Sequence, residues 1–114
     1  VAVTVTSVGQ GALPADVQVT IYRLCQEAFN NIAKHAQANQ VTIHLQYNPG
    51  KIDLVIRDDG QGFRPEQISP GHYGLSMMRE RAEAAGILLT ITSQPGSGTK
   101  IAMCWLVAPE ATNR

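Results

Sequence analysis

The chain has 114 residues, with 9 basic and 9 acidic side chains and a formal net charge of zero. This length predicts one domain over residues 1–114 with its own core, and the balanced charge excludes a global field favouring nucleic acid or an anionic membrane. No apolar run approaches the roughly 18 residues of a membrane span, so we expect no membrane contact.

The cysteines and the first residue suggest the setting of the protein. Cys25 and Cys104 are flanked by apolar residues inside predicted regular elements, which favours a reduced, cytoplasmic protein over a disulfide framework. Because the chain begins without Met, we expect it to be a piece of a longer protein.

A strand and a long helix are predicted first. Residues 1–8 alternate as a strand does. Pro14 and Asp16 mark the start of a helix from about Ala15 to about His35, because Pro suits a first turn and Asp suits the positive helix end. The helix carries one apolar stripe, made of Val17, Ile21, Leu24, Cys25, Ala28 and Ile32.

A hairpin and a loop follow. Residues 41–48 and 51–57 alternate apolar and polar side chains on either side of an Asn-Pro-Gly turn, which predicts two antiparallel strands. Residues 58–73 are rich in Gly, Pro and polar side chains. They predict a long loop, and loops of this length commonly serve as functional lids.

The last third predicts a second helix and a second hairpin. The helix spans residues 74–85, and strands follow over 87–93 and 99–107, with a frayed tail over 108–114. Most strands have one apolar face, so helices should cover one side of the sheet. The sequence therefore predicts an α+β fold, a two-layer sandwich with a mixed, mostly antiparallel sheet.

The first helix has a polar face that permits two interpretations. Glu27, Asn31 and His35 recur at spacings of four, with Lys34 beside them. Such a face is most often solvated surface. The alternative is a metal and phosphate site, in which Asn31 offers an oxygen to Mg²⁺, Lys34 meets a phosphate, and Glu27 binds or orients a metal-bound water.

Three glycine-containing patterns are also ambiguous when taken singly. Asp58-Asp59-Gly60-Gln61-Gly62 follows a strand, where a carboxylate can accept a hydrogen bond from an adenine amine, but it can equally be an Asp-Gly turn. Residues 71–75 open a helix, where phosphates bind, or simply assist the helix start. Residues 96–99 form a hairpin turn, in which Thr99 caps a phosphate or braces the carboxylate.

Other catalytic and metal-binding patterns are missing from the sequence. The three His and two Cys show no zinc-ligand spacing. There is no Ser-His-Asp set and no Walker-type Gly-Lys-Ser/Thr pattern, which excludes a P-loop protein.

In their order along the chain, the four patterns resemble the N, G1, G2 and G3 boxes of the ATPase domain shared by gyrase, Hsp90, histidine kinase and MutL proteins. The resemblance runs from about Val17 to Trp105. Residues 26–36 (QEAFNNIAKHA) and 71–82 (GHYGLSMMRERA) resemble more narrowly the N and G2 boxes of nitrate-sensor and desaturase-sensor histidine kinases. The resemblance implies a Bergerat-type ATP-binding fold.

The resemblance implies roles for the phosphate-binding residues. Asn31 would coordinate Mg²⁺ bridging the phosphates of ATP, and Glu27 would sit beside it as the second catalytic residue. Four more residues would lie near the phosphates or hold them at the second helix: Lys34, His35, Gly74 and Leu75.

It also implies roles at the base. Asp58 would bind the adenine amine, with Thr99 supporting it through a hydrogen bond or a water. Gly60 and Gly62 would leave room for base and ribose. The short lid over residues 63–73 matches the same subtype of kinases.

The resemblance implies the catalytic, ATP-binding domain of a two-component sensor histidine kinase. The γ-phosphate would go to a His on a separate dimerisation and phosphoacceptor domain, for which this chain has no segment, and then to a response regulator. The alternatives are a stand-alone ATPase or Ser kinase of the same superfamily, and a non-catalytic nucleotide-binding or docking module. The short lid argues against the former, and the intact Asn31 and Asp58 against the latter.

Overall fold

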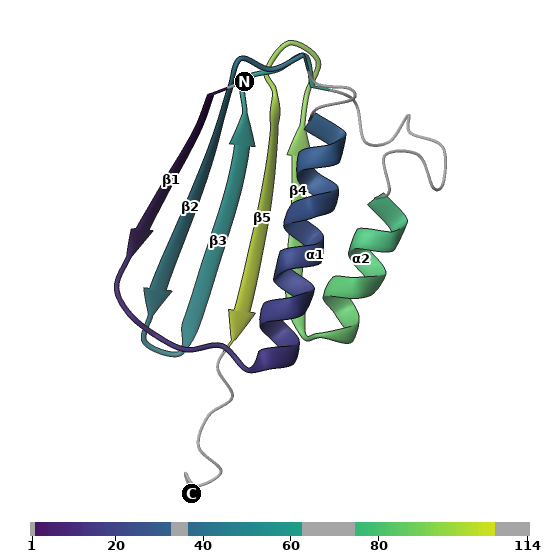
Figure 1. The fold of residues 1–114 in the computed structure, drawn as a ribbon. Helices are drawn as coiled ribbons and strands as arrows, with labels where there is room; N and C mark the ends of the chain where they lie inside the picture. Colours follow the sequence, from purple (N-terminus) through teal and green to yellow (C-terminus); the bar gives the residue numbers. More distant parts are fainter. Residues whose placement is uncertain (1, 33–36, 63–74, 107–114) are drawn as a thin grey trace, which may run out of the picture.

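The computed structural model describes residues 2–32, 37–62 and 75–106, and these contain the elements in the predicted order (Figure 1). The bounds are β1 Ala2–Val8, α1 Ala15–Asn31, β2 Gln40–Asn48, β3 Lys51–Asp58, α2 Leu75–Ala84, β4 Ile87–Ser93 and β5 Thr99–Leu106. Ile32 still has a helical backbone. The expected continuation of α1 to about His35 and the tail over 108–114 lie outside the described residues.

The helix ends follow from the residues around them. Pro14 precedes the first turn of α1 with φ −55°, and Asp16 lies in that turn, where its charge suits the positive helix end. Gly86 follows α2 with φ +74°, a backbone conformation that glycine adopts without strain, and its N–H donates to the carbonyl of Glu83 over 3.1 Å.

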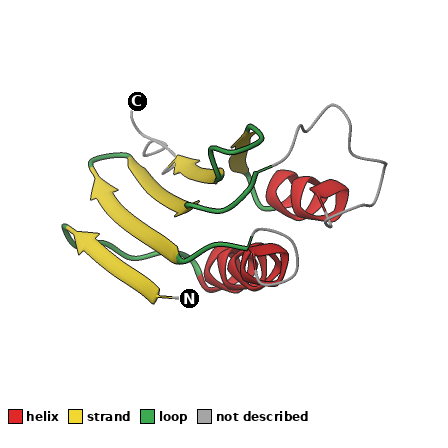
Figure 2. Cartoon of the chain, turned by 90° about the horizontal axis from the view of Figure 1, so that it is seen from above, coloured by secondary structure: helices red, strands yellow, loops and turns green. Residues whose placement is uncertain are grey.

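The sheet has the strand order β1-β2-β3-β5-β4. β1 runs parallel to β2, and the other neighbours are antiparallel. The prediction of a mixed, mostly antiparallel sheet is therefore confirmed. Both helices lie on the same side of the sheet, so the two-layer arrangement is confirmed as well (Figure 2).

The core forms where alternate strand residues meet the two helices. Leu24 of α1 is 0% exposed and Met78 of α2 is 1% exposed. Burying one such side chain contributes about 1.5–3 kcal/mol, so this layer supplies much of the driving force for folding. The other members of the core from the helices and the three inner strands are Val17, Ala28, Val41, Leu54, Ile56, Ala82, Ile101 and Met103.

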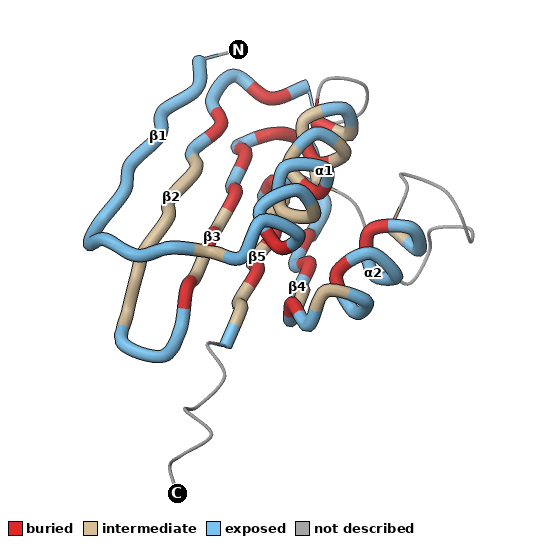
Figure 3. Tube along the Cα trace, turned by 60° about the horizontal axis from the view of Figure 1, so that its bottom comes forward, coloured by how far each residue is buried: buried red, intermediate tan, exposed pale blue. Residues whose placement is uncertain are grey.

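β1 forms as predicted but is exposed along its whole length (Figure 3). Val5 is 66% exposed, although its partner Ile43 on β2 packs against the core. The reason is the position of β1 at the sheet edge, away from the two described helices (Figure 1). Its Val and Thr side chains therefore reflect strand propensity rather than burial.

Candidate functional site

Several element ends meet at one end of the molecule: the C-terminal ends of α1, β3 and β4 and the N-terminal ends of α2 and β5 (Figure 1). Asp58 ends β3, and its cross-strand partner is Thr99, the first residue of β5. Ser93 ends β4 opposite Thr99. Asn31 ends α1 and Leu75 begins α2. The fold thus brings four predicted site residues to one end, from widely separated parts of the chain.

Asp58 is a buried carboxylate, with 8% of its surface exposed. It follows the inward alternation of Leu54 and Ile56 on β3. Its Oδ1 accepts the N–H of Gly60 over 2.8 Å. Burial raises the pKa of the Asp58 carboxyl, whereas the N–H groups of Gly60 and Thr99 lower it by a smaller amount. Such a carboxylate gains from a further hydrogen-bond donor.

Asp59 points elsewhere and has a different role, which no pattern in the sequence identified. Its Oδ1 accepts the N–H of Asn39 over 2.8 Å and that of Gln40 over 2.9 Å. These bonds tie the end of β3 to the start of β2, and they lower the pKa of the exposed Asp59 carboxyl. Asp59 therefore binds the backbone of the neighbouring strand start, whereas Asp58 faces inward.

Gly62 and Gly98 permit close backbone packing beside Asp58. Gly62 has φ +67° and Gly98 has φ +74°. A Cβ on Gly62 would collide with the carbonyl of Gln94, and one on Gly98 with the carbonyl of Asp58. The predicted role of Gly62, and of Gly60, in leaving room for base and ribose stays a prediction, because the structure explains Gly62 by packing.

Ser93 and Thr99 make a polar floor beside the carboxylate. The two hydroxyl groups are hydrogen-bonded over 2.9 Å, and Ser93 donates to the carbonyl of Gly98 over 3.1 Å. A pocket of about 230 Å³ is lined by these three residues and Asp58, together with Arg57, Thr92, Gln94, Ser97 and Lys100. Support of Asp58 by the Thr99 hydroxyl stays a prediction, since the hydroxyl bond seen here goes to Ser93.

The phosphate-binding part of the site is only partly described. Leu75 packs its half-buried side chain against the core and places the first backbone N–H groups of α2 at the site end. Such groups bind phosphate readily. The predicted residues Lys34, His35 and Gly74, and the whole short lid over residues 63–73, lie outside the described residues.

Asn31 and Glu27 offer oxygen donors that suit Mg²⁺. They lie one helical turn apart on α1, and Glu27 is half-buried. Mg²⁺ takes few protein oxygens and keeps waters and phosphate oxygens as its other ligands. Among the residues described, no three His, Cys, Asp or Glu gather into a metal site. These donors therefore fit a metal ion shared with a bound phosphate.

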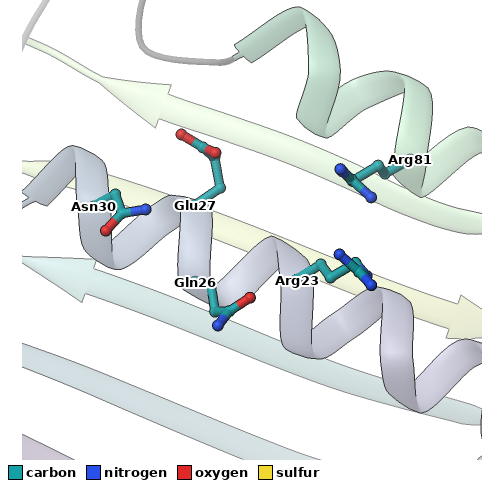
Figure 4. A pocket seen from close by; sticks show the side chains of 5 residues that line it. All are labelled: Arg23, Gln26, Glu27, Asn30 and Arg81. Atoms are coloured by element: carbon teal, nitrogen blue, oxygen red, sulfur yellow. The ribbon is translucent and has the colours of Figure 1, made fainter.

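A groove between the two helices adjoins Glu27 (Figure 4). It measures about 300 Å³, and its lining is polar: Arg23, Gln26, Glu27 and Asn30 of α1 and Arg81 of α2. Neither arginine was predicted from the sequence. The helical period places Arg23 one turn before Glu27, but no pattern in the sequence tells which side of α2 faces α1.

The described helices include none that is long and apolar enough to cross a membrane.

Comparison with known proteins identifies the fold and the family. A model of the family described as histidine kinase-, DNA gyrase B- and HSP90-like ATPase matches residues 16–110. This match contains all the site residues predicted above.

Curated relatives are sensor kinases of bacteria. The signal transduction histidine-protein kinase/phosphatase UhpB of Salmonella typhimurium is 40% identical over 96 residues, which cover 84% of this chain and 19% of that protein. The sensor histidine kinase LiaS of Bacillus subtilis is 33% identical, covering 87% of this chain and 28% of that protein. The nitrate/nitrite sensor protein NarQ of Escherichia coli is 39% identical, and the match covers 81% of this chain and 16% of that protein. The chain thus spans less than a third of each of these relatives.

Solved structures share the fold. The histidine kinase AdeS of Acinetobacter baumannii superposes with a TM-score of 0.75 at 15% identity, covering 94% of this chain and 55% of that one. The histidine kinase domain of the blue-light activated kinase EL346 of Erythrobacter litoralis superposes with a TM-score of 0.69 at 21% identity. The match covers 93% of this chain and 52% of that one. The predicted fold is confirmed, and the chain belongs to the histidine kinase-, DNA gyrase B- and HSP90-like ATPase family, as a domain of the sensor histidine kinase type.

Proposed function

We propose that this domain binds ATP with Mg²⁺ and, in a complete sensor kinase, donates the γ-phosphate to a His on a separate dimerisation and phosphoacceptor domain. The observation that carries the proposal is the buried Asp58 carboxylate, fixed by Gly60, at the end of the molecule where α2 begins and α1 ends. The family match supports the binding of ATP, and the sensor histidine kinase relatives support transfer to a His.

Asp58 selects the base. Its buried carboxylate accepts the exocyclic amine of adenine, a hydrogen bond that burial strengthens. Guanine presents a carbonyl oxygen in the corresponding place, so two acceptors would face each other there. Gly60, Gly62 and Thr99 shape this part of the site, and adenine should bind in strong preference to guanine.

The helix ends hold the phosphates. The N–H groups at the start of α2, from Gly74 and Leu75, meet phosphate oxygens. Lys34 and His35 add positive charge or hydrogen bonds nearby. Asn31 would hold Mg²⁺ together with phosphates and water, and Glu27 would orient a water or the incoming acceptor. When bound, Mg²⁺ neutralises charge that develops on the transferring phosphoryl group.

Catalysis then rests on positioning. The domain holds the γ-phosphate in line with the acceptor His, and the barrier falls because the reacting groups are already placed. The phosphate afterwards passes from the His to a response regulator. Because ATP is the substrate and both cysteines are unpaired, we place the domain on the cytoplasmic side.

The experiment is calorimetric titration with ADP and a non-hydrolysable ATP analogue, with and without Mg²⁺, and with GDP for comparison. The wild type should bind adenine nucleotides selectively, and more tightly when Mg²⁺ is present. Asp58→Asn should weaken ADP binding about 10- to 100-fold, because a hydrogen bond to a charged group contributes about 1.5–3 kcal/mol.

Asp53→Asn is the matched control, since Asp53 lies on the same strand and hydrogen-bonds Asn48 away from the site. It should leave ADP affinity unchanged. Equal loss in both variants, or unchanged affinity in Asp58→Asn, would contradict the assignment of the base-binding carboxylate. A wild type that binds no nucleotide would favour a docking module instead.

A further inference from the structure

The groove between α1 and α2 brings two arginines together from separate helices. Arg23 extends from α1, and Arg81 extends toward it from α2 (Figure 4). The groove contains a single carboxylate, that of Glu27, so its lining has a net positive charge. Like charges converge here although the chain as a whole is neutral.

Among the residues that the structure describes, neither guanidinium forms an ion pair, although Glu27 lies one helical turn from Arg23 in the same groove. The ion pair found among the described residues joins Lys51 to Asp53, at 3.7 Å, on another face. Arg81 makes one weak contact, from Nη2 to the Sδ of Met77 over 3.9 Å. A guanidinium presents a planar set of donors that matches a carboxylate in two-point fashion. Two such groups facing one groove are suited to grip an anionic side chain.

The position of the groove relates it to phosphoryl transfer. Glu27 precedes Asn31 by four residues, about 6 Å along the helix, and Arg23 precedes Glu27 by the same distance. The groove therefore begins at Asn30, next to the end of α1 that carries Asn31, and runs between the two helices to Arg23. Asp58 ends a strand of the sheet, so the proposed base site and the groove belong to different elements.

We infer that Arg23 and Arg81 form a carboxylate-binding clamp that docks the acceptor-bearing segment of the complete kinase beside the γ-phosphate. The occupant is an acidic face of that segment, because the groove offers it complementary charge. The matched relatives extend far beyond this domain, which covers 16–28% of their length, so a large part of such a kinase is available to fill the groove. The inference rests on the proposed function.

The test uses the complete kinase and separates docking from nucleotide binding. The double variant Arg23→Gln/Arg81→Gln should lower the rate of His phosphorylation at saturating ATP at least tenfold at low salt. The KM for ATP and the affinity for ADP should stay within about twofold of wild type. Salt should slow the wild type more steeply than the variant, because screening acts on the charges that the variant lacks.

Two comparisons make the result specific. Arg79→Gln/Lys51→Gln removes the same charge at exposed residues outside the groove and should retain the wild-type rate. Arg23→Lys/Arg81→Lys keeps the charge but loses the two-point geometry. Its rate of His phosphorylation should lie between those of the wild type and the Gln double variant. If the Gln double variant has a lowered melting temperature, Arg81→Gln alone gives the same test, since Arg81 is exposed.

Three outcomes would overturn the clamp. The rate of the groove variant could equal that of the charge-matched control, or its loss could be the same at every salt concentration. ADP affinity could also fall in step with the rate, which would assign the arginines to the nucleotide phosphates. Failure of the proposed function looks different, because the wild type would then bind no adenine nucleotide at all.

Discussion

Asp58 and Asp59 are neighbours in sequence with opposite electrostatic environments. Burial raises the pKa of Asp58, and two backbone N–H groups lower the pKa of Asp59. A carboxyl with a raised folded pKa favours folding below its unfolded pKa and loses that contribution as pH rises through the folded value. Ionised Asp58 therefore opposes folding at neutral pH. Ionised Asp59, whose pKa is lowered in the folded state, instead favours folding at neutral pH.

The resulting prediction concerns stability in the absence of nucleotide. Asp58→Asn keeps an acceptor for the Gly60 N–H and removes the buried charge, so its melting temperature at pH 7 should equal or exceed that of the wild type. The difference should shrink as pH falls and Asp58 becomes protonated. Thermal unfolding of the wild type and the variant from pH 4 to 8 measures the difference in melting temperature and its change with pH. A variant clearly less stable at pH 7 would show that the ionised carboxylate supports the fold.

The β4–β5 turn offers a second prediction, because two of its glycines share a backbone conformation but differ in surroundings. Gly96 has φ +82°, and a Cβ added there would meet no atom within 4 Å, whereas Gly98 has φ +74° with the Asp58 carbonyl in the way. Gly96→Ala should cost about 1–2 kcal/mol of unfolding free energy, the penalty of a left-handed backbone. Gly98→Ala should cost roughly 2 kcal/mol more, because an overpacked site must shift.

Denaturant unfolding of the two variants compares the glycines directly. Gly98→Ala should also weaken ADP binding, since the turn would move away from Asp58, whereas Gly96→Ala should not. Equal stability of the two variants would mean that the strand ends adjust freely around Gly98. The β4–β5 turn would then not hold a fixed position beside Asp58.

Regular elements and part of the site were predictable from the sequence for a local reason. Alternation along residues 51–58 places Asp58 on the same face as Ile56, so both the strand and the inward carboxylate follow from one pattern. Ser93 extends the alternation of β4 in the same way, yet a lone Ser at a strand end gives no chemical signal. Its hydroxyl matters only because β5 brings Thr99 opposite.

Features that depend on tertiary placement escaped prediction. The parallel pairing of β1 with β2 and its exposure depend on where the helices lie. The clash at Gly98 depends on the approach of another strand end. The convergence of Arg23 and Arg81 depends on how α2 is turned against α1. Sequence periodicity describes one element at a time, and each of these features joins two.

The molecule as a whole should respond to nucleotide, because the site joins the ends of both helices and three strands. A ligand that binds only the folded state at 100 times its Kd adds about 2.7 kcal/mol to the unfolding free energy. For a domain of this size that amounts to a rise in melting temperature of roughly 10 °C. Mg²⁺·ADP should produce this rise, and GDP should not.

Amide hydrogen exchange shows where this stabilisation acts. Protection on adding Mg²⁺·ADP should increase at the start of α2 and at the β3 and β5 ends around Asp58 and Thr99, whereas β1, exposed and far from these ends, should change little. Asp58→Asn should lose most of the thermal rise at the same ADP concentration, and Asp53→Asn should keep it. A rise of equal size with GDP, or protection confined to β1, would place nucleotide binding elsewhere on the fold.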